Sequence, residues 1–119
     1  MPDPTSQSFD EIDLMDRLEG DAELLGELAK TFNAIHVEQL EGLRRAFAEG
    51  NLEQLSRSAH ALKGSLMTLA ARASVHAAAL EQRAKSADRV ACEIEVDALT
   101  VALPQLAREL TAFASRQTV

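Results

Sequence analysis

The sequence of 119 residues has little of several residue types that define particular classes of protein. It has no tryptophan, no tyrosine and four phenylalanines, so its core has to be built from aliphatic side chains. A single cysteine, Cys92, excludes an internal disulfide and favours a reducing compartment. No apolar stretch approaches the roughly 20 residues that span a bilayer, and the N-terminus does not resemble a signal peptide. We therefore expect a cytoplasmic protein that does not engage a membrane.

The charge is negative overall and unevenly distributed along the chain. The formal net charge is −7. Residues 1–55 hold 13 acidic and 4 basic side chains, whereas residues 56–119 hold 6 acidic and 8 basic ones. An acidic chain with few aromatic side chains is a poor candidate for binding nucleic acid. The mildly basic second half favours an acidic protein partner, although an ordinary solvated surface explains the same distribution.

The chain has few helix breakers, with three prolines and five glycines, and its apolar residues recur with a helical period. Gly20-Asp21 and Gly50-Asn51 each pair a helix-ending glycine with a helix-starting cap. The pattern predicts five helical segments: about 9–19, about 21–49, from 52 to a break near Ala70–Ala73, 73–86, and about 89–115.

Two of these segments, the third and the last, carry the apolar stripe of a bundle helix. In the third segment the stripe has alternating spacings of three and four residues and consists of Leu52, Leu55, Ala59, Leu62, Leu66 and Leu69. We predict an all-α protein, an antiparallel four-helix bundle with a short additional N-terminal helix, over residues 9–116. Residues 1–8 contain two prolines and small polar side chains, and we predict that they form a flexible lead.

The third predicted helix places a histidine on its outward face. At 3.6 residues per turn, His60 lies roughly 130° from the centre of the apolar stripe, Gly64 roughly 170° and Lys63 about 70°. Glycine inside a helix costs about 1 kcal/mol relative to alanine, so Gly64 indicates the close approach of another molecule. Further candidates for contact with that molecule lie near His60 on the helix: Ser56, Arg57 and Met67.

The chemistry of these residue types is compatible with a site that accepts a phosphoryl group. A neutral imidazole can act as a nucleophile near neutral pH, so His60 can accept a phosphoryl group. The negative charge of that group would be offset by Lys63. An exposed histidine on a helix is most often an ordinary surface residue, and it is the combination with Lys63 and Gly64 that favours a function.

The stretch Ala59-His60-Ala61-Leu62-Lys63-Gly64-Ser65 resembles the A-H-x-L-K-G-S motif of histidine-containing phosphotransfer (HPt) domains from multistep phosphorelays. It matches at every fixed position. The surroundings are similar to those of the family, with a short helix, an acidic long helix and a turn at Gly50-Asn51-Leu52 before the motif. The resemblance covers about residues 9–115.

The resemblance implies a four-helix bundle that receives a phosphoryl group on His60 from a receiver-domain aspartate and relays it to another receiver domain. It implies a phosphocarrier without an ATP site rather than an enzyme, in which Lys63 supports charge and Gly64 permits close approach. It also implies no cofactor of its own, because magnesium belongs to the partner receiver. The implied partners are response-regulator receiver domains and a hybrid histidine kinase. We expect a monomer, and the short lead favours a stand-alone protein.

Three positions depart from the family pattern. Leu66 stands where many members have a small residue, and Ala70 stands where glycine is frequent. Leu80-Glu81 is a candidate for the L-E pattern of the following helix, but its register is one residue short. The departures concern the core, the turn and the start of the fourth helix rather than the exposed face around His60.

Two other classes of protein remain open. A histidine-kinase dimerisation domain also carries a phosphorylated histidine on a bundle helix, but usually with an acidic residue directly after it, where this chain has Ala61. A non-catalytic helical adaptor would bind a receiver domain without accepting a phosphoryl group.

The remaining candidate side chains are predicted to be ordinary. His36 and His76 lack a lysine and a glycine one turn further along, and Cys92 lies on an apolar stripe. The histidines are not spaced as metal ligands and no paired cysteines occur, so no metal site is expected.

Overall fold

The computed structural model describes residues 8–117, and its regular secondary structure is helical except for one isolated β-bridge. The helices are α1 (Glu11–Arg17), α2 (Ala22–Ala48), α3 (Leu52–Thr68), α4 (Ser74–Lys85) and α5 (Arg89–Gln117). The predicted all-α class is confirmed, and the break between the third and fourth segments falls where it was predicted. Within residues 8–117, none of the helices is apolar over enough of its length to cross a bilayer.

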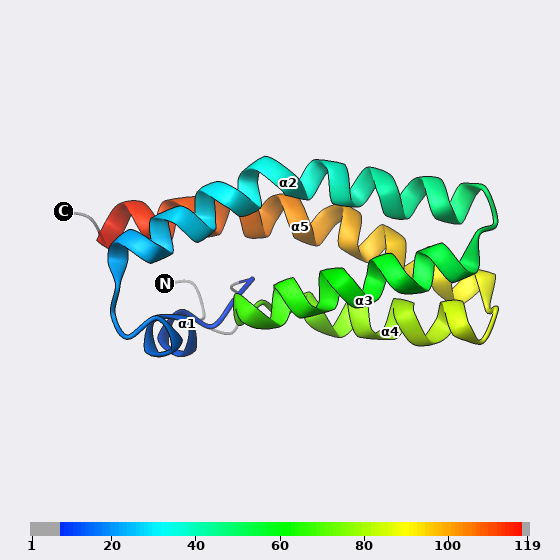
Figure 1. Cartoon of the computed structure of the whole chain (residues 1–119), viewed down its shortest axis with the longest axis horizontal. Helices are drawn as coiled ribbons and strands as arrows, with labels where there is room; N and C mark the ends of the chain where they lie inside the picture. The colour runs from blue at the N-terminus through cyan, green and yellow to red at the C-terminus, as the bar shows by residue number, and fades with distance from the viewer. Residues whose placement is uncertain (1–7, 118–119) are drawn as a thin grey trace.

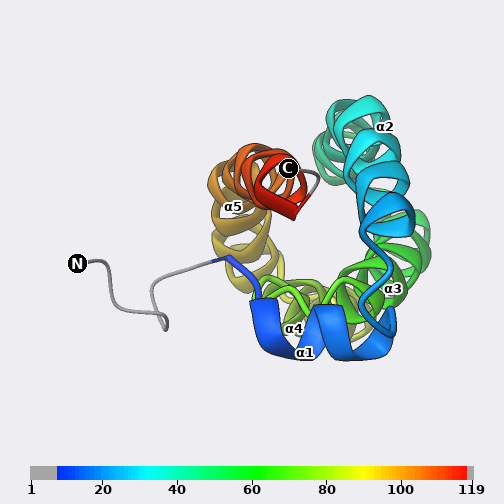
Figure 2. The same ribbon diagram turned by 90° about the vertical axis from the view of Figure 1, so that its left-hand side faces the viewer.

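Four of the helices form an antiparallel bundle (Figure 1). α2 packs on α3 and α5, and α4 packs on the same two helices, so the four close into a ring around one core. α2 and α5, with 27 and 29 residues, extend past α3 and α4 at one end of the bundle. Figure 2 shows α1 lying across that end, beside α3 and α4. The predicted four-helix bundle with a short additional N-terminal helix is confirmed.

The core is aliphatic, as the composition requires. Leucine predominates among the fully buried large side chains, and Leu62 and Leu66 of α3 are 2% and 0% exposed. Full burial of such a side chain stabilises a fold by about 1.5–3 kcal/mol. Cys92 of α5 is completely buried, and burial raises the pKa of its thiol. The predicted position of Cys92 on an apolar stripe is confirmed.

α2 and α3 begin at the capping side chains that the sequence indicates, and α5 begins at a third cap. The carboxylate of Asp21 accepts a hydrogen bond of 3.0 Å from the backbone N–H three residues on. The amide oxygen of Asn51 accepts the equivalent bond at 3.0 Å, and the carboxylate of Asp88 does so at 3.1 Å. Each cap satisfies a backbone donor that the first turn of a helix leaves without a partner, which fixes where α2, α3 and α5 start.

The turn after α3 forms without the glycine that commonly ends a helix. Ala70 has a φ of +54°, a left-handed conformation that costs an L residue about 1 kcal/mol. Its N–H donates to the carbonyl of Met67 at 3.1 Å, and the N–H of Ala71 donates to that of Leu66 at 2.9 Å. This hydrogen-bond pattern terminates helices. Gly50, with a φ of +71°, occupies the corresponding place after α2.

The first described residues differ from their prediction. Phe9 is not helical; it forms an antiparallel β-bridge with Ala71, and its buried ring packs edge-on against Phe113 with centroids 5.4 Å apart. The side chain of Asp10 caps the first helix, so α1 begins at Glu11. The predicted start at residue 9 was wrong because the chain pairs with the α3–α4 turn before it enters the helix.

The predicted flexible lead covers residues 1–8, of which 1–7 lie outside the described residues. Ser8 is fixed, because its N–H and its hydroxyl each donate a 2.8 Å hydrogen bond to the carboxylate of Glu109 on α5. Burial acts to raise the pKa of Glu109, but the bonds from Ser8 and one from Gln105 bring it below its ordinary value. Ser8, which the predicted lead includes, thus has hydrogen-bond partners on α5.

Replacing Ala70 by glycine is expected to raise the free energy of unfolding by up to about 1 kcal/mol, because glycine adopts the left-handed conformation without steric cost. Ala34→Gly, at an exposed position inside α2, is the control and should lower this free energy by about 1 kcal/mol. Chemical denaturation measures both changes. A loss of stability in Ala70→Gly would show that the packing of the Ala70 methyl group contributes more than the relief of the left-handed backbone conformation.

Candidate functional site

His60 projects from the middle of α3 into solvent. Its side chain is 67% exposed, so the predicted outward position is confirmed. Gly64, one turn on, is also exposed, and a Cβ added there would meet no other atom within 4 Å. Packing among the described residues therefore does not require a glycine at this position.

A carboxylate from the neighbouring helix lies beside the histidine ring. Glu81 of α4 is 5% exposed, and its Oε2 lies 3.0 Å from Nδ1 of His60. Its Oε1 accepts a hydrogen bond of 2.8 Å from Nζ of Lys63, and Nζ of Lys85 lies 3.3 Å from Oε2. α3 and α4 thus contribute two side chains each to one group, the His60–Glu81 cluster, which comprises His60, Lys63, Glu81 and Lys85.

The protonation of Glu81 determines which nitrogen of His60 can react. The hydrogen bond from Lys63 lowers the pKa of Glu81 from 4.5 to about 2; burial opposes this shift, and Lys85 and His60 add to it. An ionised carboxylate only accepts hydrogen bonds, so its contact with His60 assigns the ring hydrogen to Nδ1. Nε2 then keeps its lone pair and is the nucleophilic nitrogen of the ring.

Lys63 has a contact that the sequence did not indicate. Its side chain is 28% exposed, and its ammonium group is bonded to Glu81 rather than standing free beside His60. Salt weakens a partly buried pair of this kind less than it weakens a fully exposed one. In the structure Lys63 therefore acts first on Glu81, and through that carboxylate it acts on the orientation of His60.

The packing of α3 leaves two of the three predicted contact residues exposed and buries the third. Arg57 and Met67 are exposed, and Arg57 pairs with Glu53 on the same helix at 3.4 Å. Ser56 is 8% exposed, and its hydroxyl donates a hydrogen bond of 3.4 Å to the backbone carbonyl of Glu81. Ser56, a predicted contact residue, is therefore covered by α4 and not exposed beside His60.

The other histidines lie outside the cluster. His36 is buried and stacks on Phe32 with ring centroids 5.5 Å apart. Nδ1 of His76 lies 2.8 Å from Oε2 of Glu95, so this side chain also has a carboxylate partner and serves as a natural comparison for His60. Within residues 8–117, no three side chains of the metal-binding types are grouped so as to hold an ion.

The sequence gives little indication that Glu81 belongs to the site. The residue is part of the Leu80-Glu81 pair, and Lys85 follows it at the spacing of an ion pair on one helix. Its contacts with His60 and Lys63 join residues 21 and 18 positions apart, and they depend on how α3 packs against α4. The local pattern could suggest the pair with Lys85 but not the contact with the histidine.

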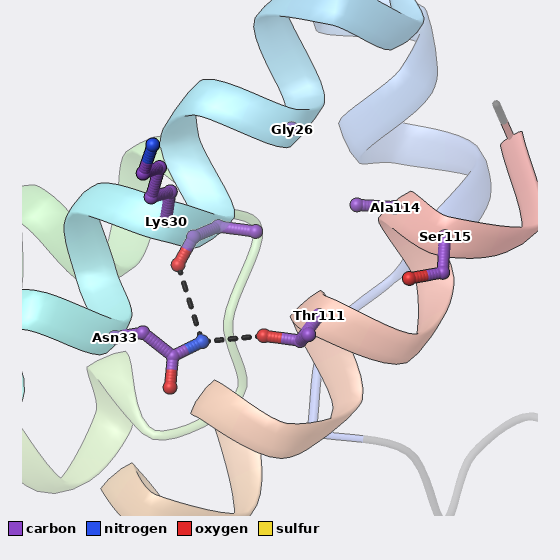
Figure 3. A pocket seen from close by; sticks show the side chains of 7 residues that line it. Gly26, Lys30, Asn33, Thr111, Ala114 and Ser115 are labelled. Carbon is purple, nitrogen blue, oxygen red and sulfur yellow. Dashed lines mark hydrogen bonds between the residues drawn. The ribbon is translucent and has the colours of Figure 1, made fainter.

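A separate pocket of about 370 Å³ lies between α2 and α5, where α3 and α4 contribute nothing to its lining. Figure 3 shows the amide of Asn33 bonded to the carbonyl of Ala29 and to the hydroxyl of Thr111. The same amide reaches the carbonyl of Ala107 at 3.2 Å. These bonds join α2 to α5, so Asn33 and Thr111 contribute to the packing of the bundle.

Fold and site together define a helical bundle that displays one histidine over an ionised, lysine-bound carboxylate. The chain matches the family model of the Hpt domain over residues 27–115, and it therefore belongs to the Hpt family. The matched region runs from α2 to α5 and includes the whole His60–Glu81 cluster. Membership implies a role as a phosphocarrier in phosphorelays. Searches of curated proteins and of solved structures gave no match.

Replacing Glu81 by glutamine is expected to make the free energy of unfolding less dependent on pH in the acid range. Because folding lowers the pKa of Glu81 from 4.5 to about 2, the ionised carboxyl stabilises the fold above pH 4.5, and this contribution is lost as the pH falls toward 2. Urea denaturation between about pH 6 and about pH 2.5 measures the difference from wild type.

Glu53→Gln, which removes an exposed carboxylate of α3, is the control for this experiment. If Glu81→Gln loses stability with falling pH as steeply as wild type and the control do, the cluster does not hold Glu81 ionised.

Proposed function

We propose that the chain is a histidine phosphotransfer protein that accepts a phosphoryl group on His60 from a receiver-domain aspartate and relays it to another receiver domain. The observation that supports this most directly is the 3.0 Å contact between Nδ1 of His60 and the buried carboxylate of Glu81. It leaves the lone pair on Nε2 of a side chain that is 67% exposed. A phosphorylated side chain on another protein can approach such a nucleophile.

The transfer itself is a displacement at phosphorus. The lone pair of Nε2 attacks, a nitrogen–phosphorus bond forms, and the bond between phosphorus and the aspartyl oxygen breaks. The receiver's aspartate leaves as a carboxylate with the bonding electron pair. The hydrogen on Nδ1 of His60 stays in place, and the carboxylate of Glu81 offsets the positive charge that the ring acquires. Transfer to the second receiver reverses these steps.

The lysines support the transferred group by charge. With a neutral imidazole, the ionised Glu81 and its two lysine partners carry a net charge of about +1, and a phosphoryl group adds nearly two negative charges. Lys63 and Lys85 therefore offset part of that charge. Exposed charge contacts contribute no more than about 1 kcal/mol because water screens them, so the effect of either lysine on transfer is several-fold.

The magnesium ion that assists transfer belongs in this proposal to the receiver domain, and the chain supplies no cofactor of its own. The partners are response-regulator receiver domains and a hybrid histidine kinase, with the chain acting as a cytoplasmic monomer. Arg57 and Met67 are exposed on α3 and are available to contact a receiver.

His60→Gln is expected to abolish phosphorylation by a radiolabelled phosphorylated receiver domain, because glutamine has no nucleophilic ring nitrogen. His76→Gln, which removes the other carboxylate-held histidine, should accept label as wild type does, and so should His36→Gln if it folds. Acid-labile label that persists in His60→Gln would contradict the assignment. A receiver that binds wild type without ever transferring label would indicate the adaptor instead.

Gly64→Gln is expected to slow transfer while leaving the fold intact or slightly more stable. The added side chain meets no other atom within 4 Å of its Cβ, and the helix interior gains up to about 1 kcal/mol when glycine is replaced. The obstruction would therefore fall on the receiver alone. Thermal melting and transfer rates are measured together, and unchanged values for both would show that Gly64 has no steric role.

A further inference from the structure

α2 carries a regular stripe of exposed residues on the side that turns away from the core. The members recur with alternating spacings of four and three residues along the helix, which is the spacing of the contact residues in a pair of wound helices. α2 forms one long edge of the bundle, and no other described element covers this side of it (Figure 1). We define the α2 outer stripe as Glu23, Glu27, Lys30, Ala34, Val37, Glu41, Arg44 and Ala48.

The charged side chains of the α2 outer stripe have no partner of opposite charge among the described residues. Within residues 8–117, every ion pair joins residues of the other helices. Glu27 lies three residues before Lys30, and Glu41 lies three before Arg44, so both pairs have a spacing at which helical side chains can meet. Because neither pair forms, these four charges are free to contact another molecule.

The order of the charges along the α2 outer stripe is complementary to itself in the antiparallel direction. When two copies of α2 cross antiparallel at the middle of the stripe, Lys30 of one copy faces Glu41 of the other, and Glu27 faces Arg44. A two-fold axis repeats both contacts. A parallel pair would place each residue opposite its own copy, so that like charges would repel. Antiparallel pairing is therefore the arrangement that the charges favour.

The middle of the α2 outer stripe is small and apolar. Ala34 and Val37 lie on either side of the midpoint, and Val37 is 54% exposed. Beside them is a hollow of about 570 Å³ that only residues of α2 line, Gly42 among them. In the antiparallel pair Ala34 faces Val37 of the other copy. Small side chains at the crossing allow two helix axes to approach to about 8–10 Å.

We propose that two copies of the chain pair through the α2 outer stripe as an antiparallel dimer with two-fold symmetry. A second copy is the expected occupant because the stripe matches itself in spacing, in charge and in the position of its small residues. Exposed ion pairs contribute little individually, so the dimer is weak, with a Kd on the order of 100 μM at low salt. Below that concentration the chain is the monomer of the proposed function.

The pairing leaves His60 accessible in both copies. Leu28 and Ile35 line the pocket that α2 forms with α3, and they lie roughly 130–150° around the helix from the centre of the α2 outer stripe. The second copy is therefore bound on a side of α2 that does not face α3. The inference does not rest on the proposed function, because it uses only the exposed residues of α2.

The main experiment reverses one charge in each of two variants and then mixes them. Sedimentation equilibrium of the full chain at low salt, from about 10 μM to about 1 mM, should show that wild type dimerises. Lys30→Glu should raise the Kd at least about tenfold, because both of its contacts become repulsive, and Glu41→Lys should do the same. An equimolar mixture of the two variants should dimerise with about the wild-type Kd, because each reversed charge then faces the other.

Two further variants control for the change in net charge. Arg83→Glu on α4 and Glu93→Lys on α5 reverse exposed charges outside the α2 outer stripe and should dimerise as wild type does. Circular dichroism checks that every variant folds. About 0.5 M salt should raise the wild-type Kd several-fold, because water and ions screen exposed charges.

Three outcomes would overturn the proposal. One is a wild-type chain that stays monomeric at about 1 mM and low salt. Another is a dimer that Lys30→Glu and Glu41→Lys leave intact, which would place the contact on a different surface. The third is a mixture of these two variants that stays as weakly associated as each variant alone, since that result would show that Lys30 and Glu41 do not face each other.

Discussion

The rest of the site depends on the hydrogen bonds that the buried carboxylate of Glu81 makes with its neighbours. A charge removed from water is tolerated when hydrogen bonds and opposite charges surround it, and Lys63, Lys85 and His60 provide them. These contacts fasten α4 to α3 and orient the histidine at the same time. The stability of the bundle and the orientation of the His60 ring are therefore coupled through one side chain, so a change at Glu81 affects both.

α3 has three surfaces with different tasks. Its leucine stripe fills the core, its flank toward α4 carries the charged contacts, and its remaining face is kept low by Gly64 and by hydroxyls that bond to their own helix. The glycine that is unfavourable for an isolated helix has no neighbour that requires it. In the proposed function this cost is explained by the close approach of a receiver domain.

Much of the fold follows from local sequence, since caps such as Asn51 and the periodic leucines specify where the helices begin and which face they bury. The outward position of His60 follows from the same periodicity. Helical phase alone could not show that Ser56 is covered, because that depends on where α4 lies. It also could not reveal the contact of Glu81 with His60. The left-handed turn at Ala70 was equally hidden, because the residue type does not favour it and hydrogen bonds from neighbouring residues impose it.

Non-covalent contacts hold the two ends of the described chain close to each other. Ser8 is bonded to Glu109, and Glu11 of the first helix pairs with Arg116 in the last turn of α5 at 3.0 Å. Both ends thus lie at the same end of the molecule (Figure 1). A circularly permuted chain, with these ends joined by a linker and new termini opened in the turn at Gly50, would retain the same helix contacts. The order in which the helices are connected is therefore separable from the packing that creates the surface around His60.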